Sequence, residues 1–175
     1  MNDRFGGVVE DAQIRAAFEG LRLRTRIGGQ VRALTAIGRY GKSSTQLRFR
    51  TQTAPDGTRW PPSRRVQEDG GQTLRDTSRL RNSIQWRVDP TGVSWGTNVV
   101  YAGVHQDGYQ GSQRVGAHQR VIRIAFGRRL NSPVTVRVRP FSRNMRIVAR
   151  PFLGISNDDR RAILAILSDD LERRG

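Results

Sequence analysis

The fold is decided by a stretch in the middle of the chain, residues 84–95, which reads Ile84-Gln85-Trp86-Arg87-Val88-Asp89-Pro90-Thr91-Gly92-Val93-Ser94-Trp95. Apolar residues alternate with polar ones on both sides of a short turn sequence. Such alternation is typical of strands that bury one face. The Asp-Pro-Thr-Gly segment between the two runs is rich in residues that favour turns. The stretch therefore predicts a β-hairpin at the centre of the chain.

A long helix is predicted before this hairpin. Two apolar stripes with helical spacing occur there, the first at Ile14, Ala17, Phe18 and Leu21 and the second at Leu23, Ile27, Val31, Leu34 and Ile37. Apolar residues at such intervals line one side of an amphipathic helix. Gly20 and the pair Gly28-Gly29 weaken the helical pattern. We expect one long helix, broken in places, from about residue 9 to about residue 38.

A second helix is predicted near the C-terminus. Ser156 is suited to cap its start, and Asp158 and Asp159 follow in the first turn, where the helix dipole favours acids. The inner stripe of this helix comprises Ile163, Leu164, Leu167 and Leu171. Two terminal helices around central strands predict an α+β fold, with a small antiparallel sheet flanked by a long N-terminal helix and a C-terminal helix.

Residues 40–73 lose all periodicity and contain the turn signal Pro55-Asp56-Gly57. A structureless stretch of this length is uncommon inside a compact domain, so we expect a mobile arm or a loop ordered by a neighbour. Trp60 lies within it and would be costly to leave in water. We expect this side chain to pack on its own core or on a neighbouring subunit. A short helix is predicted next, from Leu74 to Leu80.

A second, basic hairpin is predicted within residues 109–145, joined by the segment Gly127–Pro133. On its first strand Ile122, Ile124 and Phe126 share one face and Arg123 lies on the other face. On its second strand Val134, Val136 and Val138 alternate with Thr135, Arg137 and Arg139. This pattern predicts one apolar and one arginine-rich face. Residues 146–149 form a further candidate strand.

The charge of the chain is high and uneven. Of 31 basic residues only Lys42 is lysine, and the formal net charge is +16. Residues 21–65 and residues 109–150 each carry a net charge of +10, whereas the rest of the chain is slightly acidic. Such blocks repel themselves when packed together. They favour a nucleic acid, an acidic protein or an anionic membrane face as partner, or else a solvated surface in a protein with an arginine bias.

Several classes of function lack support in the sequence. The chain has no cysteine and two histidines, which argues against thiol chemistry and against a histidine-rich metal site. No apolar run approaches the roughly 20 residues needed to span a bilayer. Residues 38–43 resemble the end of a phosphate-binding loop, but Ala36 replaces a required glycine and no buried strand precedes it. His105 lies near Asp107 without an identifiable nucleophile. We expect no enzyme, no cofactor and no metal.

Four segments, in order along the chain, resemble a known family. They are Gln52-Thr53-Ala54-Pro55-Asp56-Gly57-Thr58-Arg59-Trp60, Leu74-Arg75-Asp76-Thr77-Ser78-Arg79-Leu80-Arg81-Asn82-Ser83-Ile84, Gly96-Thr97-Asn98-Val99-Val100-Tyr101-Ala102-Gly103-Val104-His105-Gln106-Asp107-Gly108, and Arg150-Pro151-Phe152-Leu153-Gly154-Ile155-Ser156. This family is the phage virion morphogenesis family, the tail completion proteins of Mu-like contractile-tailed phages. Ser78 departs from the pattern, which usually has glycine there. The basic stretch between the last two segments is longer than the usual connection.

The resemblance implies a structural virion protein, without catalysis, in a six-fold ring at the head–tail junction, assembled in the host cytoplasm and without a membrane. It implies portal-side neck or connector proteins and tail terminator, tube or sheath proteins as partners, with genomic DNA in passing contact. In such a ring we expect a single domain, 1–175, whose arm 40–73 and hairpin insertion 109–145 meet neighbours. The candidate interface residues are Trp60, Arg48, Arg50, Arg59, Arg123, Arg137 and Arg139. The alternative is non-specific nucleic-acid binding through arginine-rich surfaces.

Overall fold

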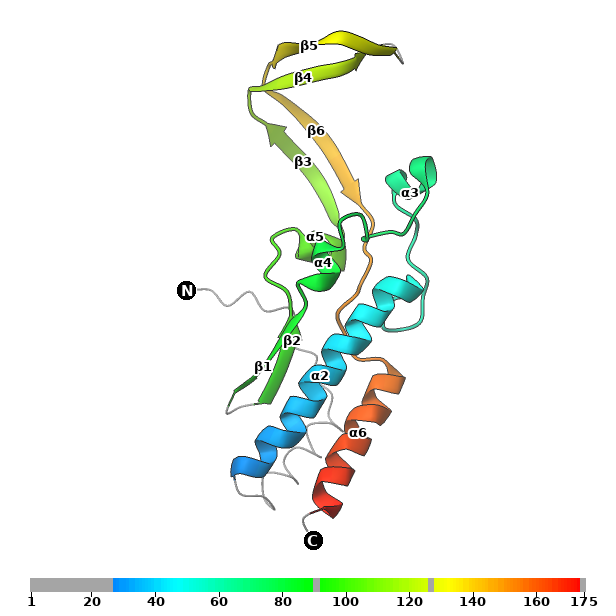
Figure 1. Cartoon of the computed structure of the whole chain (residues 1–175), viewed down its shortest axis with the longest axis vertical. Coiled ribbons are helices and arrows are strands. Elements are labelled where there is room, and N and C mark those ends of the chain that lie inside the picture. The colour runs from blue at the N-terminus through cyan, green and yellow to red at the C-terminus, as the bar shows by residue number, and fades with distance from the viewer. Residues whose placement is uncertain (1–26, 90–91, 126–127, 174–175) are drawn as a thin grey trace.

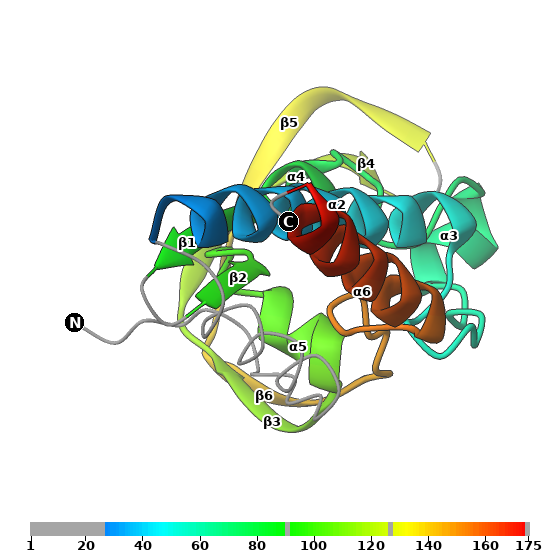
Figure 2. The same ribbon diagram turned by 90° about the horizontal axis from the view of Figure 1, so that it is seen from below.

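A long central helix organises the body of the molecule. The computed structural model describes residues 27–89, 92–125 and 128–173. Helix α2 (Ile27–Thr51) contacts the hairpin of β1 (Gln85–Asp89) and β2 (Gly92–Gly96) as well as the C-terminal helix α6 (Asn157–Glu172). Helices α2 and α6 lie side by side and run in opposite directions (Figures 1 and 2). The predicted α+β class, with a helix on either side of the strands in sequence, is confirmed.

Helix α2 continues well beyond the residue where the sequence predicts its end. Ala33, Leu34 and Ile37 are buried as expected, and the same side of the helix continues through Thr45 and Phe49, both 0% exposed. The inward positions after residue 37 include glycine, threonine and arginine, which give no apolar periodicity. The predicted end near residue 38 is therefore wrong. The predicted portion before residue 27 lies outside the described residues.

Two glycines explain how the central hairpin approaches α2 so closely. A Cβ atom on Gly38 would lie 2.7 Å from Trp86 Cε3, and one on Gly41 would lie 2.5 Å from Trp95 Cδ2. The two tryptophans are paired across the hairpin. The glycine-rich segment that resembles a phosphate-binding loop is thus the middle of a helix against which two indole rings pack. The hairpin predicted for residues 84–95 is confirmed, with an antiparallel register from Gln85↔Gly96 to Asp89↔Gly92.

Residues 40–73 do not form an extended arm. The first part is helical, and a short turn follows in which Ala54 N donates to Thr58 O and Trp60 N donates to Gln52 O. Helix α3 (Arg64–Asp69) then begins at Ser63, whose hydroxyl accepts a hydrogen bond from Val66 N. Buried side chains occur throughout this stretch. The arm prediction failed because its core residues are isolated single positions rather than a periodic set.

The next segment also differs from its prediction. Helix α4 spans Arg79–Asn82, whereas Leu74 and Ser78 adopt left-handed conformations with φ of +59° and +57°. The helix predicted for Leu74–Leu80 is therefore wrong over most of its length, since the left-handed region interrupts a right-handed helix. Ser78 adopts the backbone conformation that glycine favours, so the turn keeps this geometry without a glycine.

The start of helix α6 follows its prediction closely. The Ser156 hydroxyl accepts a hydrogen bond from Asp159 N, and the Asp159 carboxylate accepts one from Ser156 N, which completes a capping box. Ile163 and Leu167 are buried against Ala33 and Ile37 of α2. The predicted cap is confirmed, and so are Ile163, Leu167 and Leu171 of the inner stripe, whereas Ile166 takes part in this cluster in place of Leu164.

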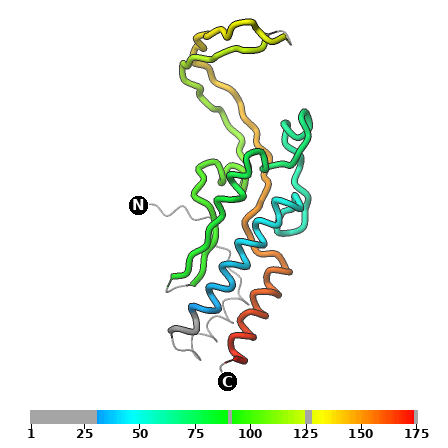
Figure 3. Tube along the Cα trace, in the orientation of Figure 1, coloured from blue at the N-terminus to red at the C-terminus, as the bar shows by residue number. Residues whose placement is uncertain are grey.

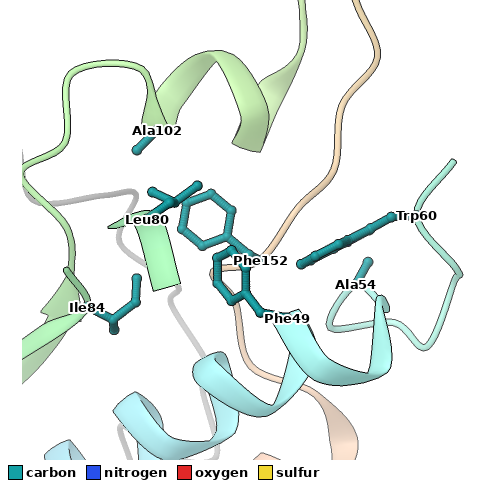
Figure 4. Packing of buried hydrophobic residues seen from close by; sticks show 7 residues of the cluster. All are labelled: Phe49, Ala54, Trp60, Leu80, Ile84, Ala102 and Phe152. Atoms are coloured by element: carbon teal, nitrogen blue, oxygen red, sulfur yellow. The ribbon is translucent and has the colours of Figure 1, made fainter. Parts of the chain in front are cut away.

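One cluster of buried side chains, here called the aromatic cluster, joins distant parts of the chain (Figure 4). The ring centroid of Phe49 lies 5.4 Å from that of Trp60 and 5.3 Å from that of Phe152. Each of the four segments that carry the family resemblance contributes at least one member. The aromatic cluster comprises Phe49, Ala54, Trp60, Leu80, Ile84, Ala102 and Phe152. The four segments, although separated in the sequence, therefore build one shared core.

A two-part hairpin projects from this body (Figures 1 and 3). It leaves the body after the short helix α5 (Ala102–Asp107), and its four strands are β3 (Tyr109–Val115), β4 (His118–Ala125), β5 (Arg128–Val138) and β6 (Phe141–Ile147). Strand β3 pairs with β6 and β4 pairs with β5, both antiparallel. We call the β3–β6 pair the stem and the β4–β5 pair the tip.

Candidate assembly surface

The hairpin is anchored to the body by a set of hydrogen bonds to main-chain groups. Arg150 follows the stem and is 7% exposed. Its guanidinium donates to the carbonyl oxygens of Pro61, Pro62 and Val148. Burial lowers the pKa of Arg150, but three carbonyl partners compensate part of the lost hydration. This arginine therefore fastens the end of the hairpin to the loop before α3.

Gln106 fastens the same region from the other side. Its side-chain oxygen accepts hydrogen bonds from Phe152 N and Leu153 N, and its side-chain nitrogen donates to Leu153 O. His105 O accepts a hydrogen bond from Arg150 N. The amide of Gln106 thus satisfies main-chain groups of a segment that has no strand partner. The residues that most resemble the family pattern hold the backbone in place rather than forming an exposed site.

A buried ion pair links α2, α6 and the segment between the hairpin and α6. The guanidinium of Arg48 forms an ion pair with the carboxylate of Asp159. It also donates to the carbonyl oxygens of Phe152 and Gly154, each at 2.9 Å. Burial raises the pKa of Asp159, but hydrogen bonds from Ser44 and Ser156 and the charge of Arg48 outweigh it and leave the pKa below its ordinary value. Burial lowers the pKa of Arg48. Asp159 is thus both a capping residue and a counter-ion.

The predicted interface residues fall into two groups. Trp60 is 6% exposed within the aromatic cluster, and its indole Nε1 donates to Pro151 O at 2.9 Å. Arg48 is 6% exposed and ion-paired. Both side chains therefore belong to the interior of their own subunit, which corrects their prediction as interface residues. The predicted residues that the structure leaves exposed are Arg50, Arg59, Arg123, Arg137 and Arg139.

His105 is half-buried beside Tyr101. Its Nδ1 is buried without a hydrogen-bond partner, and its ring stacks edge-on against Tyr101 at 5.9 Å. Burial and then the charge of Arg150 lower the pKa of His105. In the described part of the chain, no group of three or more His, Cys, Asp or Glu side chains could hold a metal ion. None of the helices in that part is long and apolar enough to cross a membrane.

The stem has one mostly apolar face. Residues directly opposite in an antiparallel pair share a face. Tyr109 lies opposite Ile147, Gly111 opposite Met145, and Val115 opposite Phe141, with the polar pair Gln113↔Arg143 between the last two. The ring of Tyr109 lies across Gly111, where a Cβ atom would be 2.8 Å from the phenol oxygen. The other face carries the pairs Gln110↔Arg146, Ser112↔Asn144 and Arg114↔Ser142.

The tip mixes cations and aliphatic side chains on one face. Ile122 lies opposite Val134, whereas Arg120 lies opposite Val136 and His118 opposite Val138. The register shifts between Ile122 and Ile124, where β5 contains extra residues. The predicted antiparallel pairing of this hairpin is confirmed, but residues 128–133, predicted to belong to its connection, lie in β5, and the aliphatic face also carries arginine. The candidate strand 146–149 covers only the end of β6, which stops at Ile147. Sequence reasoning also missed the pairing of β3 with β6, because the polar residues of β3 hide its alternation.

The hairpin exposes much of what it carries. Val121 is 52% exposed, Ile124 is 65% exposed and Val134 is 49% exposed. Residues 109–147 contain nine arginines and no acidic residue. Each of its sheets has two strands, so every strand has one edge without a main-chain partner in the sheet. Two-stranded sheets of this kind gain stability and lose open edges when they dock on a partner. The hairpin therefore leaves cationic and aliphatic side chains exposed together beside open strand edges.

Comparison with known proteins matches the sequence to one family model. The family model described as the phage virion morphogenesis family matches residues 9–172. No curated protein and no solved structure matches the chain. The matched range includes the four segments of the aromatic cluster, the hairpin and most of α6.

Proposed function

The chain belongs to the phage virion morphogenesis family, and from this membership we propose that it is a structural protein of the head–tail junction in a contractile-tailed, Mu-like phage. In this role it completes the tail as a homo-oligomeric ring of six-fold symmetry and helps join the tail to the head. Its neighbours in the proposal are portal-side neck or connector proteins and tail terminator, tube or sheath proteins. DNA makes passing contact in the channel.

The observation that carries this proposal is the contrast between a well-packed body and a projecting hairpin. The body buries residues from all four motif segments in one aromatic cluster. The hairpin, by comparison, exposes aliphatic side chains and arginines. Contacts that close a ring are heterologous, so a projecting element of one subunit must meet a different face of its neighbour or another protein. Arg50 and Arg59 remain proposed contact residues on the body, and Arg123, Arg137 and Arg139 on the hairpin.

Electron microscopy of particles made without this chain tests the proposal. A phage carrying an early stop codon in the gene should yield filled heads and separate tails, and supplying the chain should restore joined particles. Three-dimensional reconstruction of complete virions should place density for the chain at the junction as a ring. Normal joined virions in the mutant, or density located elsewhere in the particle, would contradict the proposal.

Non-specific nucleic-acid binding is the alternative function, and the nine arginines of the hairpin favour it. Neutralising several phosphates makes affinity fall steeply with salt. A filter-binding titration of the full chain with duplex DNA separates the two functions. A steep loss of binding as salt rises would support the alternative. Absence of binding near 50 mM salt, the low end of the range where such proteins bind well, would exclude it.

A further inference from the structure

We propose that the hairpin, through its strands β3 to β6, docks on an acidic and partly apolar surface of a protein other than this chain. The inference rests on the proposed role in a virion and specifies the chemistry of one neighbour. Its starting point is the tip, where Arg120 lies directly opposite Val136 and Arg129 directly opposite Ile124. A surface that covers this face must receive cations and aliphatic side chains side by side.

The aliphatic side chains argue against nucleic acid as the main occupant. A phosphate backbone would neutralise the arginines, but it offers no apolar partner to Ile124, which is 65% exposed, or to Val134, which is 49% exposed. Aromatic side chains that would stack on bases are also rare here, and the stem's Tyr109 packs across Gly111. A protein surface covers both kinds of side chain at once, since interface cores combine apolar contacts with arginine pairs.

The charges argue against a second copy as the acceptor. Two hairpins placed together would bring nine arginines against nine with no acidic residue between them. Of the 31 basic residues 22 lie outside the hairpin, against 15 acidic ones, so the rest of a second copy is net positive as well. Like charges across an interface oppose association, whereas a complementary surface favours it. An acceptor with an excess of carboxylates therefore suits the hairpin better than a second copy of this chain does.

The open strand edges indicate how the contact is made. Each strand of the stem and tip pairs on one side only in the described sheets. An acceptor that adds a strand to such an edge gains main-chain hydrogen bonds, and side-chain pockets then set specificity. Residues 116–117 and 139–140 separate the stem from the tip without regular structure, and a Cβ atom on Gly116 would meet nothing within 4 Å. The tip can therefore lie on the acceptor at an angle to the stem.

Photo-crosslinking within assembled particles tests the identity of the acceptor. The photoreactive residue p-benzoylphenylalanine replaces Val134 or, in a second variant, Ile124; a control variant carries it at Leu47, which is 47% exposed on α2. Purified particles are irradiated, and crosslinked peptides are identified by mass spectrometry. We expect both hairpin variants to form crosslinks to a virion protein other than this chain, within a segment of that protein that contains Asp or Glu. A product with a second copy or with DNA, or no product, would overturn the inference.

A charge reversal tests the carboxylates. Arg120→Glu combined with Arg129→Glu should reduce incorporation into particles at least about tenfold, as expected when charges at a docked surface are reversed. Arg39→Glu, at an exposed position of α2, should change incorporation less than about twofold. Melting temperatures of the purified chains confirm that both variants fold. Unchanged incorporation of the hairpin variant would overturn the inference. Absence of the unmodified chain from the particles would instead refute the proposed function.

Discussion

The body and the hairpin use arginine in opposite ways. In the body, Arg48 and Arg150 are buried, and their guanidinium groups bind a carboxylate and several main-chain carbonyl oxygens. In the hairpin, nine arginines occur without an acidic residue, and Arg143 binds the side chain of Gln113 on the neighbouring strand. The net charge of +16 therefore comes from arginines in two different environments. Part of it stabilises a fold, and part of it is available to partners.

The comparison predicts that equal substitutions have very unequal effects in the two regions. Phe49→Ala should lower the free energy of unfolding by about 3–5 kcal/mol, the usual cost of truncating a buried aromatic residue. Phe49 is 0% exposed and contacts both Trp60 and Phe152. The matched variant Phe141→Ala removes a ring that is 44% exposed in the stem. Urea denaturation of both variants measures the difference, and equal losses would show that the hairpin belongs to the same folding unit.

The buried ion pair gives the next largest effect. Asp159→Asn leaves the guanidinium of Arg48 without its counter-ion, and we expect a loss of about 3 kcal/mol, the lower end for breaking a buried pair. The side chains of Arg48 and Asp159 are 7% and 5% exposed. Asp158→Asn is the control, since Asp158 and its partner Arg161 are 80% and 75% exposed and such pairs contribute little. Chemical denaturation at neutral pH compares them, and equal losses would contradict the assignment.

The same pair predicts how stability depends on pH. The pKa of Asp159 is lowered in the folded chain, so the folded state keeps the carboxylate charged to lower pH than the unfolded state does. Its contribution is fully present above the unfolded value, near 3.9, and is lost as pH falls through the folded value. Melting temperatures between about pH 5 and pH 2 should therefore fall less steeply in Asp159→Asn than in the unmodified chain. Parallel curves would contradict this.

Close packing of α2 against the central hairpin gives a smaller effect. Gly41→Ala places a Cβ atom 2.5 Å from the Trp95 ring. Overpacking costs about 1–3 kcal/mol, which exceeds the gain of up to about 1 kcal/mol that alanine brings to a helix, so we expect a net loss of about 1–2 kcal/mol. Gly103→Ala in α5, where nothing lies within 4 Å, should be neutral or stabilising. Thermal denaturation distinguishes the two, and a stabilised Gly41 variant would show that Trp95 can move.

Gly41 also shows where prediction from the sequence stops. The central hairpin, the cap of α6 and the tip strands could be predicted, because alternation, capping and helical spacing are local signals. The end of α2 could not, since its inward positions after Ile37 include Gly41, Thr45 and Arg48, whose burial depends on partners distant in sequence. Periodicity reports apolar residues only. A helix that buries glycine against tryptophan, or arginine against aspartate, therefore reads as a loop.

The candidate surface shows the same division. Arg123, Arg137 and Arg139 could be assigned to an exposed strand face because they alternate with aliphatic residues, and the structure exposes them. Trp60 could not be assigned, because an aromatic residue in an aperiodic segment has the same sequence signature whether it packs inside or outside its subunit. Its position is decided by Phe49 and by the carbonyl oxygen of Pro151. We accordingly expect Trp60→Ala to destabilise the monomer rather than to affect assembly alone.

Removal of the hairpin should have the smallest effect on the stability of the body. Tyr109 and Ile147 lie opposite each other at the base of the stem, so their Cα atoms are about 4.5–5.5 Å apart. A two-residue Asn-Gly turn fits between such residues and can replace residues 110–146. The anchors Gln106 and Arg150 lie outside the deletion, and their hydrogen bonds to residues 61, 62, 152 and 153 remain.

We therefore expect the melting temperature of this truncated chain to stay within about 3 °C of the full chain, corresponding to less than about 1 kcal/mol. Incorporation into particles should be lost, because the exposed arginines and aliphatic side chains are gone. Calorimetry of the purified chain and electron microscopy of complemented particles measure the two effects separately. A truncated chain that unfolds would show that the stem completes the core. One that folds and still assembles would move the docking surface to the body, toward Arg50 and Arg59.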